Sequence, residues 1–321
     1  MKKISIISLV VILLAMNNCS TPYKKLTKYA TMDEMVYSSP VKKVLLPTSG
    51  YEIAYTDEGE GSKTIIFIHG LGSYLPAWSK NTKSLKSNFR CIAIDLPGYG
   101  KSSKKPHSGM MTFYASIIKE FVTELKLGEV VLAGHSMGGQ ISITTALLYP
   151  DMVKALVLVD PAGFERFHEG QKQWFRDVMT AEGVRKTPVE TIQNNLATNF
   201  YRVPKDAEFM INDRISMRTA ADFEAYCYTV VQSVNGMIDE PVIDRLDQIT
   251  QPTLILFGAN DNLIPNRYLN PGKTVDIAKY GASKIKGSKL VMVPKCGHFM
   301  MFEKPEVFNQ EVLGFLSNSS H

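Results

Sequence analysis

The sequence predicts an α/β fold: a mostly parallel, eight-stranded sheet with helices on both faces and an inserted helical cap. Short apolar runs alternate with helix-like patterns along the chain, which is the order that a parallel sheet requires. Several runs are apolar at every position, as expected for strands that are covered on both faces. The alternation stops after residue 163 and resumes near residue 250, so the segment between these points is expected to be an insertion.

Eight segments have strand character. The first two are joined at Ser49-Gly50, and the remaining six are separated by helical patterns. We expect strands at residues 41–46, 51–56, 64–68, 91–94, 130–133, 155–159, 253–257 and 290–293. The main helical patterns fall between about 73 and 87, at 112–126 and 140–149, near 273–282 and at 305–316. The core of the fold is therefore expected in residues 41–163 and 250–317.

Residues 164–249 contain amphipathic helical patterns that are rich in aromatic residues and methionine. We expect this segment to form a helical cap over the carboxyl ends of the strands, where substrate-binding loops gather in such sheets. Most cap aromatics should pack the cap against itself and against the core. A roof over a site also needs an apolar lining, and the candidates for substrate contact are Trp174, Phe175, Phe223 and Tyr226.

The composition is that of an ordinary globular protein, with 45% hydrophobic and 21% charged residues among 321. The formal net charge is +5, and Lys2 and Lys3 supply two of these charges, so nucleic acid is not an expected partner. The four cysteines form no C-x-x-C pattern and have no metal-ligand spacing with histidine. We expect no metal, no cofactor and no disulfide framework.

The amino terminus resembles a secretory signal. Lys2 and Lys3 precede an apolar run over residues 4–16, which is short for a membrane span. The following Met16-Asn17-Asn18-Cys19 is similar to a bacterial lipoprotein cleavage box, although Asn18 replaces the usual Gly, Ala or Ser. We expect residues 1–19 to be a signal peptide with lipid attached to Cys19, residues 20–40 to be a tether, and the protein to be exported across the inner membrane to the cell envelope. Ordinary signal cleavage and an uncleaved anchor remain alternatives.

The motif that carries the chemistry is Gly134-His135-Ser136-Met137-Gly138-Gly139, between the strand at 130–133 and the helix at 140–149. A serine in a sharp turn between strand and helix is a nucleophile elbow. The turn strains the serine backbone, and glycines on both sides remove side chains that would collide with it. The helix amino terminus favours developing negative charge. Ser136 is therefore the candidate nucleophile.

A serine nucleophile needs a base within hydrogen-bond reach and a carboxylate that orients the base. His298 follows the last predicted strand, and Asp261 follows the strand before it. The carboxyl ends of parallel strands meet at one edge of the sheet, so these side chains should approach Ser136. Asp160 lies at the end of the strand at 155–159 and is the rival acid. The chain order Ser136, Asp261, His298 is that of the serine hydrolases with a nucleophile elbow.

Two backbone N–H groups are candidates for the oxyanion hole. One belongs to Met137, directly after the nucleophile, and the other to Leu71 in the Gly-rich loop after the strand at 64–68. We interpret His69, in the same loop, as a structural residue that holds the loop in place. His135 has the same interpretation, because chain geometry should direct it away from Ser136.

Together these motifs resemble the α/β-hydrolase superfamily, in its capped branch of esterases and related hydrolases, over residues 41–317. The segments that carry the resemblance are His69-Gly70, Asp95-Leu96-Pro97-Gly98-Tyr99-Gly100-Lys101-Ser102, the Ser136 elbow, Gly258-Ala259-Asn260-Asp261 and Gly297-His298. The resemblance implies a Ser-His-Asp triad that hydrolyses a small-molecule carboxylic ester through an acyl-enzyme, without a cofactor. Residues 266–288 depart from shorter members and are expected to form an extra rim over the site.

Several alternatives within this superfamily stay open. Members that open epoxides or displace halide carry Asp at the elbow, and Ser136 argues against both. Carbon–carbon bond hydrolases keep the triad but usually have a Ser-Gly-Pro-Gly loop after His-Gly, which this chain lacks. Proline-releasing peptidases, cofactor-free haloperoxidases and a ligand-binding lipoprotein with little turnover are the others.

Overall fold

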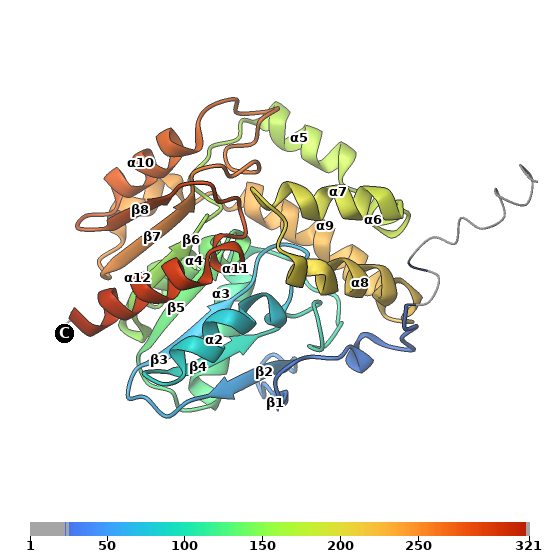
Figure 1. The fold of residues 1–321 in the computed structure, drawn as a ribbon, viewed down its shortest axis with the longest axis horizontal. Helices are drawn as coiled ribbons and strands as arrows, with labels where there is room; N and C mark the ends of the chain where they lie inside the picture. Colours follow the sequence, from blue (N-terminus) through green and yellow to red (C-terminus); the bar gives the residue numbers. More distant parts are fainter. Residues whose placement is uncertain (1–22, 24–25, 319–321) are drawn as a thin grey trace, which may run out of the picture.

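The computed structural model describes residue 23 and residues 26–318 (Figure 1). Its centre is an eight-stranded sheet with the strand order β1-β2-β4-β3-β5-β6-β7-β8. Strand β2 pairs antiparallel with β1 and with β4, and all other pairs are parallel. The predicted fold class is confirmed. The strands are β1 (Lys42–Leu45), β2 (Glu52–Glu58), β3 (Thr64–Ile68), β4 (Arg90–Ile94), β5 (Val130–His135), β6 (Val153–Val159), β7 (Thr253–Gly258) and β8 (Lys289–Val293).

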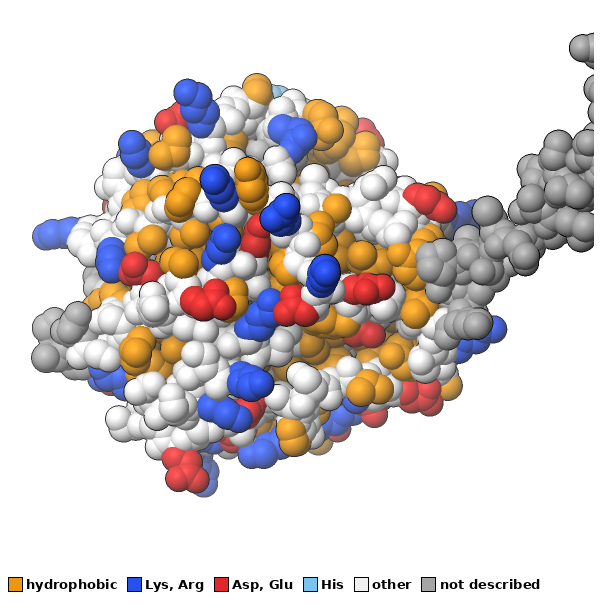
Figure 2. Space-filling model, viewed as in Figure 1, with side chains coloured by type: hydrophobic (Ala, Val, Ile, Leu, Met, Phe, Trp, Pro, Cys, Tyr) orange, Lys and Arg blue, Asp and Glu red, His pale blue; other side chains and the backbone are white. Residues whose placement is uncertain are grey.

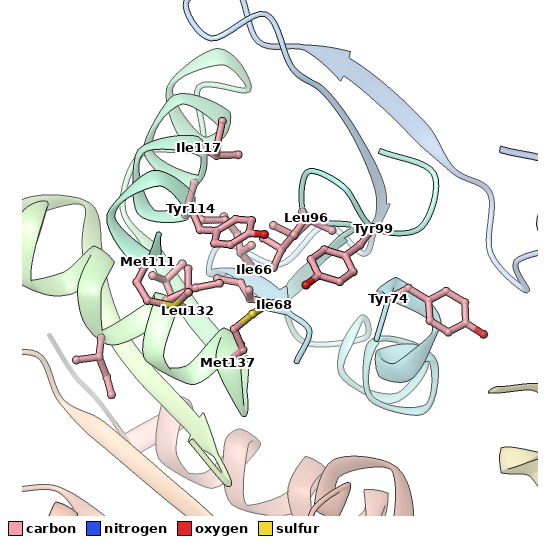
Figure 3. Close-up of a cluster of buried hydrophobic side chains, with 14 of the residues drawn as sticks. Ile66, Ile68, Tyr74, Leu96, Tyr99, Met111, Tyr114, Ile117, Leu132 and Met137 are labelled. Carbon is pink, nitrogen blue, oxygen red and sulfur yellow. The ribbon is translucent and has the colours of Figure 1, made fainter. Parts of the chain in front are cut away.

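Helices cover both faces of the sheet because successive side chains of a strand point to opposite faces. In β3, Ile66 and Ile68 belong to one buried cluster, whereas Ile65 and Phe67 belong to the other. Figure 3 shows part of the first cluster, with Ile66 and Ile68 beneath side chains of α3. That cluster is covered by α3 (Met111–Glu124), α4 (Met137–Leu148) and α10 (Thr274–Lys284), and the second by η3 (Leu75–Trp78), α2 (Ser79–Leu85), α11 (Met300–Glu303) and α12 (Pro305–Asn318).

The inserted segment between β6 and β7 is helical, and its helices lie together on the right of Figure 1. They are α5 (Glu169–Val178), α6 (Ala181–Arg185), α7 (Val189–Thr198), α8 (Glu208–Ser216) and α9 (Phe223–Asp239), with the short η5 (Lys205–Ala207), η6 (Met217–Thr219) and η7 (Ile243–Gln248).

Helix α9 fastens this cap to the core. Ser233 Oγ lies 2.9 Å from the hydroxyl of Tyr99 and 2.8 Å from that of Tyr114. Gly236 packs directly on the core, since a Cβ there would lie 2.1 Å from the backbone oxygen of Gly109. The backbone of α9 therefore approaches the core more closely than any side chain would permit.

Residues 29–35, which precede β1, pack onto the molecule. We expected residues 20–40 to be a tether, but Tyr29, Met32 and Met35 are buried. A short 3₁₀ turn, η2 (Met32–Glu34), lies within this segment. Residues 1–22, including the predicted signal peptide and Cys19, lie outside the described residues.

Within the part of the chain that the structure describes, no helix is both long and apolar enough to cross a membrane. On the face that Figure 2 shows, positive and negative side chains are interspersed, and that face presents no broad surface of one sign.

Candidate active site

The backbone at Ser136 is strained, as the elbow motif predicts. Ser136 joins β5 to α4 with φ 53° and ψ −118°, a region that residues with side chains rarely adopt. A Cβ at Gly134 would lie 2.2 Å from the oxygen of Gly138, and one at Gly138 would lie 2.2 Å from the oxygen of Ile68. The turn can therefore form only with glycine at both positions. The turn leaves Ser136 in the wall of a cavity between the core and the cap.

His298 and Asp261 form a buried pair. The Nδ1 atom of His298 lies 2.7 Å from Oδ2 of Asp261, and the two side chains are 3% and 0% exposed. The other carboxylate oxygen, Oδ1, accepts hydrogen bonds from the backbone N–H groups of Leu263 and Ile264. Since the Asp261 carboxylate accepts its other hydrogen bonds from N–H groups, Nδ1 of His298 is assigned as the donor of this one. The Nε2 atom of His298 is then the nitrogen that can accept a proton.

Asp160, the rival acid, lies beside this pair but does not orient the histidine. Its Oδ1 accepts a hydrogen bond from the Gly258 N–H at 2.8 Å, and its Oδ2 is buried without a hydrogen-bond partner in the described structure. A carboxylate oxygen of Asp160, a carboxylate oxygen of Asp261 and a ring nitrogen of His298 lie within 4.8 Å of one another. Burial, and next the charge of Asp261, raise the pKa of Asp160 well above its ordinary value of 3.8. The neutral form of Asp160 is therefore favoured more strongly than that of an exposed carboxyl group.

The two predicted oxyanion donors, Leu71 and Met137, belong to segments that lie next to Ser136. Met137 is the first residue of α4, directly after Ser136. Its side chain points into the core beside Ile68 (Figure 3), away from the cavity. Leu71 lines the cavity from the loop after β3. A Cβ at neighbouring Gly70 would lie 3.1 Å from Cβ of Ser136. The Leu71 loop therefore passes close to the serine.

Both neighbouring histidines are buried and held by the backbone. The N–H of Leu96 donates to Nε2 of His69, and Nδ1 of His69 lies 2.8 Å from the oxygen of Gly70. Both ring nitrogens of His69 are thus used to hold its loop. Nε2 of His135 lies 2.9 Å from the oxygen of His298, which ties the elbow to the His298 loop. Burial lowers the pKa of both histidines.

A cavity of about 800 Å³ lies between the core and the cap, and Ser136, His298 and Leu71 are in its wall. Of the four cap aromatics predicted to contact substrate, Phe175 and Tyr226 line this cavity. Trp174 does not, because its side chain is 42% exposed and packs edge-on against Phe175. Phe223 also stays out of the lining and stacks on Tyr226 at a ring separation of 5.7 Å.

Sequence reasoning missed three charged residues in the cavity wall, Glu165, Asp213 and Arg214. Burial raises the pKa of Glu165, and its carboxylate accepts a hydrogen bond from the Asn266 N–H at 2.7 Å. Asp213 accepts a short hydrogen bond from the hydroxyl of Tyr74. Arg214 carried a signal that could have revealed it: with cavity-lining Met210 and Met217, it lies on one helical face at spacings of four and three.

The mostly parallel sheet, the serine elbow and the histidine–carboxylate pair beyond β7 and β8 are together the arrangement that defines an α/β-hydrolase. Comparison with known proteins agrees with this class. The sequence model of a family described as alpha/beta hydrolase fold matches residues 63–305, and the chain belongs to this family.

Among curated relatives, a 2-hydroxy-6-oxononadienedioate/2-hydroxy-6-oxononatrienedioate hydrolase of Pseudomonas putida is 26% identical over 280 residues, covering 83% of this chain and 92% of that protein. Among solved structures, a probable hydrolytic enzyme of Pseudomonas aeruginosa PAO1 superposes with a TM-score of 0.81 at 25% identity, covering 90% of this chain and 99% of that one. A thermophilic esterase of Thermogutta terrifontis gives 0.70 at 26% identity, with 87% and 98% covered. The protein is thus similar both to a hydrolase named for dienedioate substrates and to an esterase.

Proposed function

We propose that the protein is a serine hydrolase that cleaves carboxylic esters through an acyl-enzyme. The observation that carries this proposal is the serine at a strained elbow, in the wall of the same cavity as a histidine whose Nδ1 is paired with a buried carboxylate. Similarity to the Thermogutta terrifontis esterase supports it.

In the proposed reaction, Nε2 of His298 takes the hydroxyl proton of Ser136 as the serine oxygen attacks the ester carbonyl carbon. The N–H groups of Leu71 and Met137 stabilise the oxyanion that forms. His298 then returns the proton to the leaving alcohol, and the acyl group stays on Ser136. Water, activated by the same histidine, releases the acid and restores the serine.

A panel of p-nitrophenyl esters with acyl chains from acetate to palmitate tests this proposal. The cavity wall is largely apolar, and each buried methylene is worth roughly 0.8 kcal/mol, so kcat/KM should rise about fourfold per carbon until the cavity is full. Longer chains must displace the cap, and their rates should fall. Phe175→Ala should change this profile, whereas Trp174→Ala, outside the lining, is the matched control. A flat profile that neither substitution alters would contradict an apolar acyl site.

A second candidate is carbon–carbon bond hydrolysis in a substrate that carries a carboxylate. The observation that favours it is Arg214, whose guanidinium lies 5.0 Å from the Tyr226 ring and whose Nη1 is buried with no hydrogen-bond partner among the described residues. Arg214 is half-buried, and its Nη2 donates to the oxygen of Val184. A guanidinium in a cavity wall with a buried, unpaired N–H group favours an anionic ligand. The Pseudomonas putida relative is named for hydrolysis of dioates.

A second set of p-nitrophenyl esters, with acyl chains that end in a carboxylate, tests the role of Arg214. If Arg214 binds a carboxylate, Arg214→Gln should reduce kcat/KM for carboxylate-ended chains about tenfold or more, and affect methyl-ended chains little. Arg185→Gln is the matched control, because Arg185 lies on the exposed side of the cap in an ion pair with Glu182. An enzyme that hydrolyses no ester but cleaves a 2-hydroxy-6-oxo-dienedioate would replace the first candidate by the second.

The cellular location of the protein is a separate proposal. We propose that the protein is exported and anchored in the cell envelope by lipid on Cys19, on the strength of the signal-like residues 2–19. Membrane fractionation of wild type and Cys19→Ala tests this, with the variant expected to move to the soluble fraction. Equal partitioning of both proteins would remove the lipoprotein proposal.

A further inference from the structure

Residues 29–37 form a strap that joins the cap to the core. On the cap side, the N–H of Tyr29 donates to Oγ1 of Thr219 at 2.9 Å, and the N–H of Ala221 donates to the oxygen of Ala30 at 2.8 Å. The N–H of Met32 donates to Oδ1 of Asp222 at 2.9 Å. The first half of the strap is therefore held against the segment that connects α8 to α9.

The second half of the strap is held by the core. The ammonium of Lys101 donates to the oxygen of Asp33 at 2.7 Å. The hydroxyl of Tyr37 donates to Oδ2 of Asp95 at 2.7 Å, and Oδ1 of Asp95 accepts the N–H of Leu75 at the same distance. Asp95, directly after β4, thus fixes the strap and the loop after β3 together. In Figure 1 this blue segment runs beside α8.

The strap separates the cavity from solvent by a single layer of chain. Met32 and Met35 are 1% and 2% exposed, and both line the cavity that holds Ser136. Asp33, Glu34 and Val36 lie on the outer side and are exposed, Val36 to 79%. Tyr226, another lining residue, donates from its hydroxyl to the oxygen of Gly72, beside Leu71. The strap also adjoins the loop that carries Leu71, since the Tyr37 ring lies 5.7 Å from that of Tyr74.

We propose that the strap is a wall of the substrate cavity, and that Met32 and Met35 set the size of the apolar substrate group that the enzyme accepts. The proposal rests on the proposed ester hydrolysis and adds a specificity element to it. Methionine is flexible and polarisable, so it adapts to apolar groups of different shape. Four more methionines line the same cavity, Met179, Met210, Met217 and Met237. The strap lies before the residues that the family model matches, 63–305, so this wall is not part of the matched core.

The test measures how fast fluorophosphonates of graded alkyl length label Ser136, together with kcat/KM for the ester panel. Each Met→Ala change removes about three methylene-sized groups, so the double variant Met32→Ala/Met35→Ala should shift the best chain length by about two to four carbons toward longer chains. Met35→Phe should shift it toward shorter chains. The matched control is Val36→Ala, on the same strap but facing solvent, and it should keep the wild-type profile.

Circular dichroism and the melting temperature show whether each variant folds, and the single variants Met32→Ala and Met35→Ala serve if the double variant does not. A folded variant whose chain-length profile equals that of wild type in both assays overturns the proposal. Uniform loss at every chain length, without a shift, overturns it too, because that is the effect of a merely structural strap. A protein that is labelled but hydrolyses no ester refutes the proposed function, while the labelling profile still decides the role of the strap.

Discussion

Ser136→Ala should abolish ester hydrolysis and fluorophosphonate labelling while leaving the fold intact. Loss of the nucleophile of a Ser-His-Asp triad lowers kcat on the order of 10⁴- to 10⁶-fold, because the remaining groups can only polarise the carbonyl. The fold should tolerate the change, since the elbow is held by backbone contacts such as the Ser136 N–H donating to the oxygen of Val159 at 2.9 Å. Turnover, labelling and melting temperature are the measurements.

The matched control is Ser116→Ala, at an exposed position of α3, where activity and labelling should remain those of wild type. Labelling of Ser136→Ala at the wild-type rate would show that another residue is the nucleophile. A loss of activity together with a lowered melting temperature would show instead that Ser136 supports the fold.

Asp261→Asn should lower kcat on the order of 10⁴-fold, whereas Asp160→Asn should cost little. The carboxylate of Asp261 accepts a hydrogen bond from Nδ1 of His298 at 2.7 Å. An amide at this position can donate its own N–H to Nδ1, which favours the imidazole tautomer that cannot act as the base. Burial and the charge of Asp261 favour the neutral form of Asp160, and an amide of the same shape imitates that form. The measurement is kcat for both variants at neutral pH. If Asp160→Asn lowers kcat strongly while Asp261→Asn does not, Asp160 rather than Asp261 is the acid that orients His298.

The same pair predicts a pH dependence of stability. The pKa of Asp160 is raised in the folded state, so the unfolded chain releases the proton first as pH rises above about 4. The contribution of this group to stability is therefore complete below pH 4 and is lost as pH rises toward the folded-state pKa. Asp160→Asn removes that loss. Its melting temperature relative to wild type should rise between pH 4 and 7, and a constant difference would show that Asp160 does not titrate this way.

The sheet and the reactive segments were predictable because their signals are local. An apolar run such as residues 64–68 specifies a strand wherever it lies, and Gly134 and Gly138 specify the turn around Ser136. Choosing Asp261 over Asp160 was already less direct, since both follow a strand. Only the structure shows which carboxylate reaches His298.

The cavity wall was less predictable because it depends on which face of each cap helix meets the core. Trp174 and Phe175 are neighbours in sequence, yet Trp174 is 42% exposed outside the cavity and Phe175 lines it. Tyr29, Met32 and Met35 lie in a stretch of mixed apolar and polar residues, and sequence alone does not distinguish them from the exposed Val36 beside them. The spacing of Arg214 from Met210 and Met217 indicates a shared helical face, but which way that face points is known only once the helix has been placed.

The cap is unevenly packed, and this has a consequence for its local opening. Helices α5 and α6 bury no residue and α7 buries only Ile192, whereas α9 buries residues along most of its length. Each fully buried apolar side chain adds about 1.5–3 kcal/mol to the free energy of detaching its helix. Amide protons should therefore exchange through small, frequent excursions in α5–α7, while those of α9 exchange only when the whole molecule unfolds.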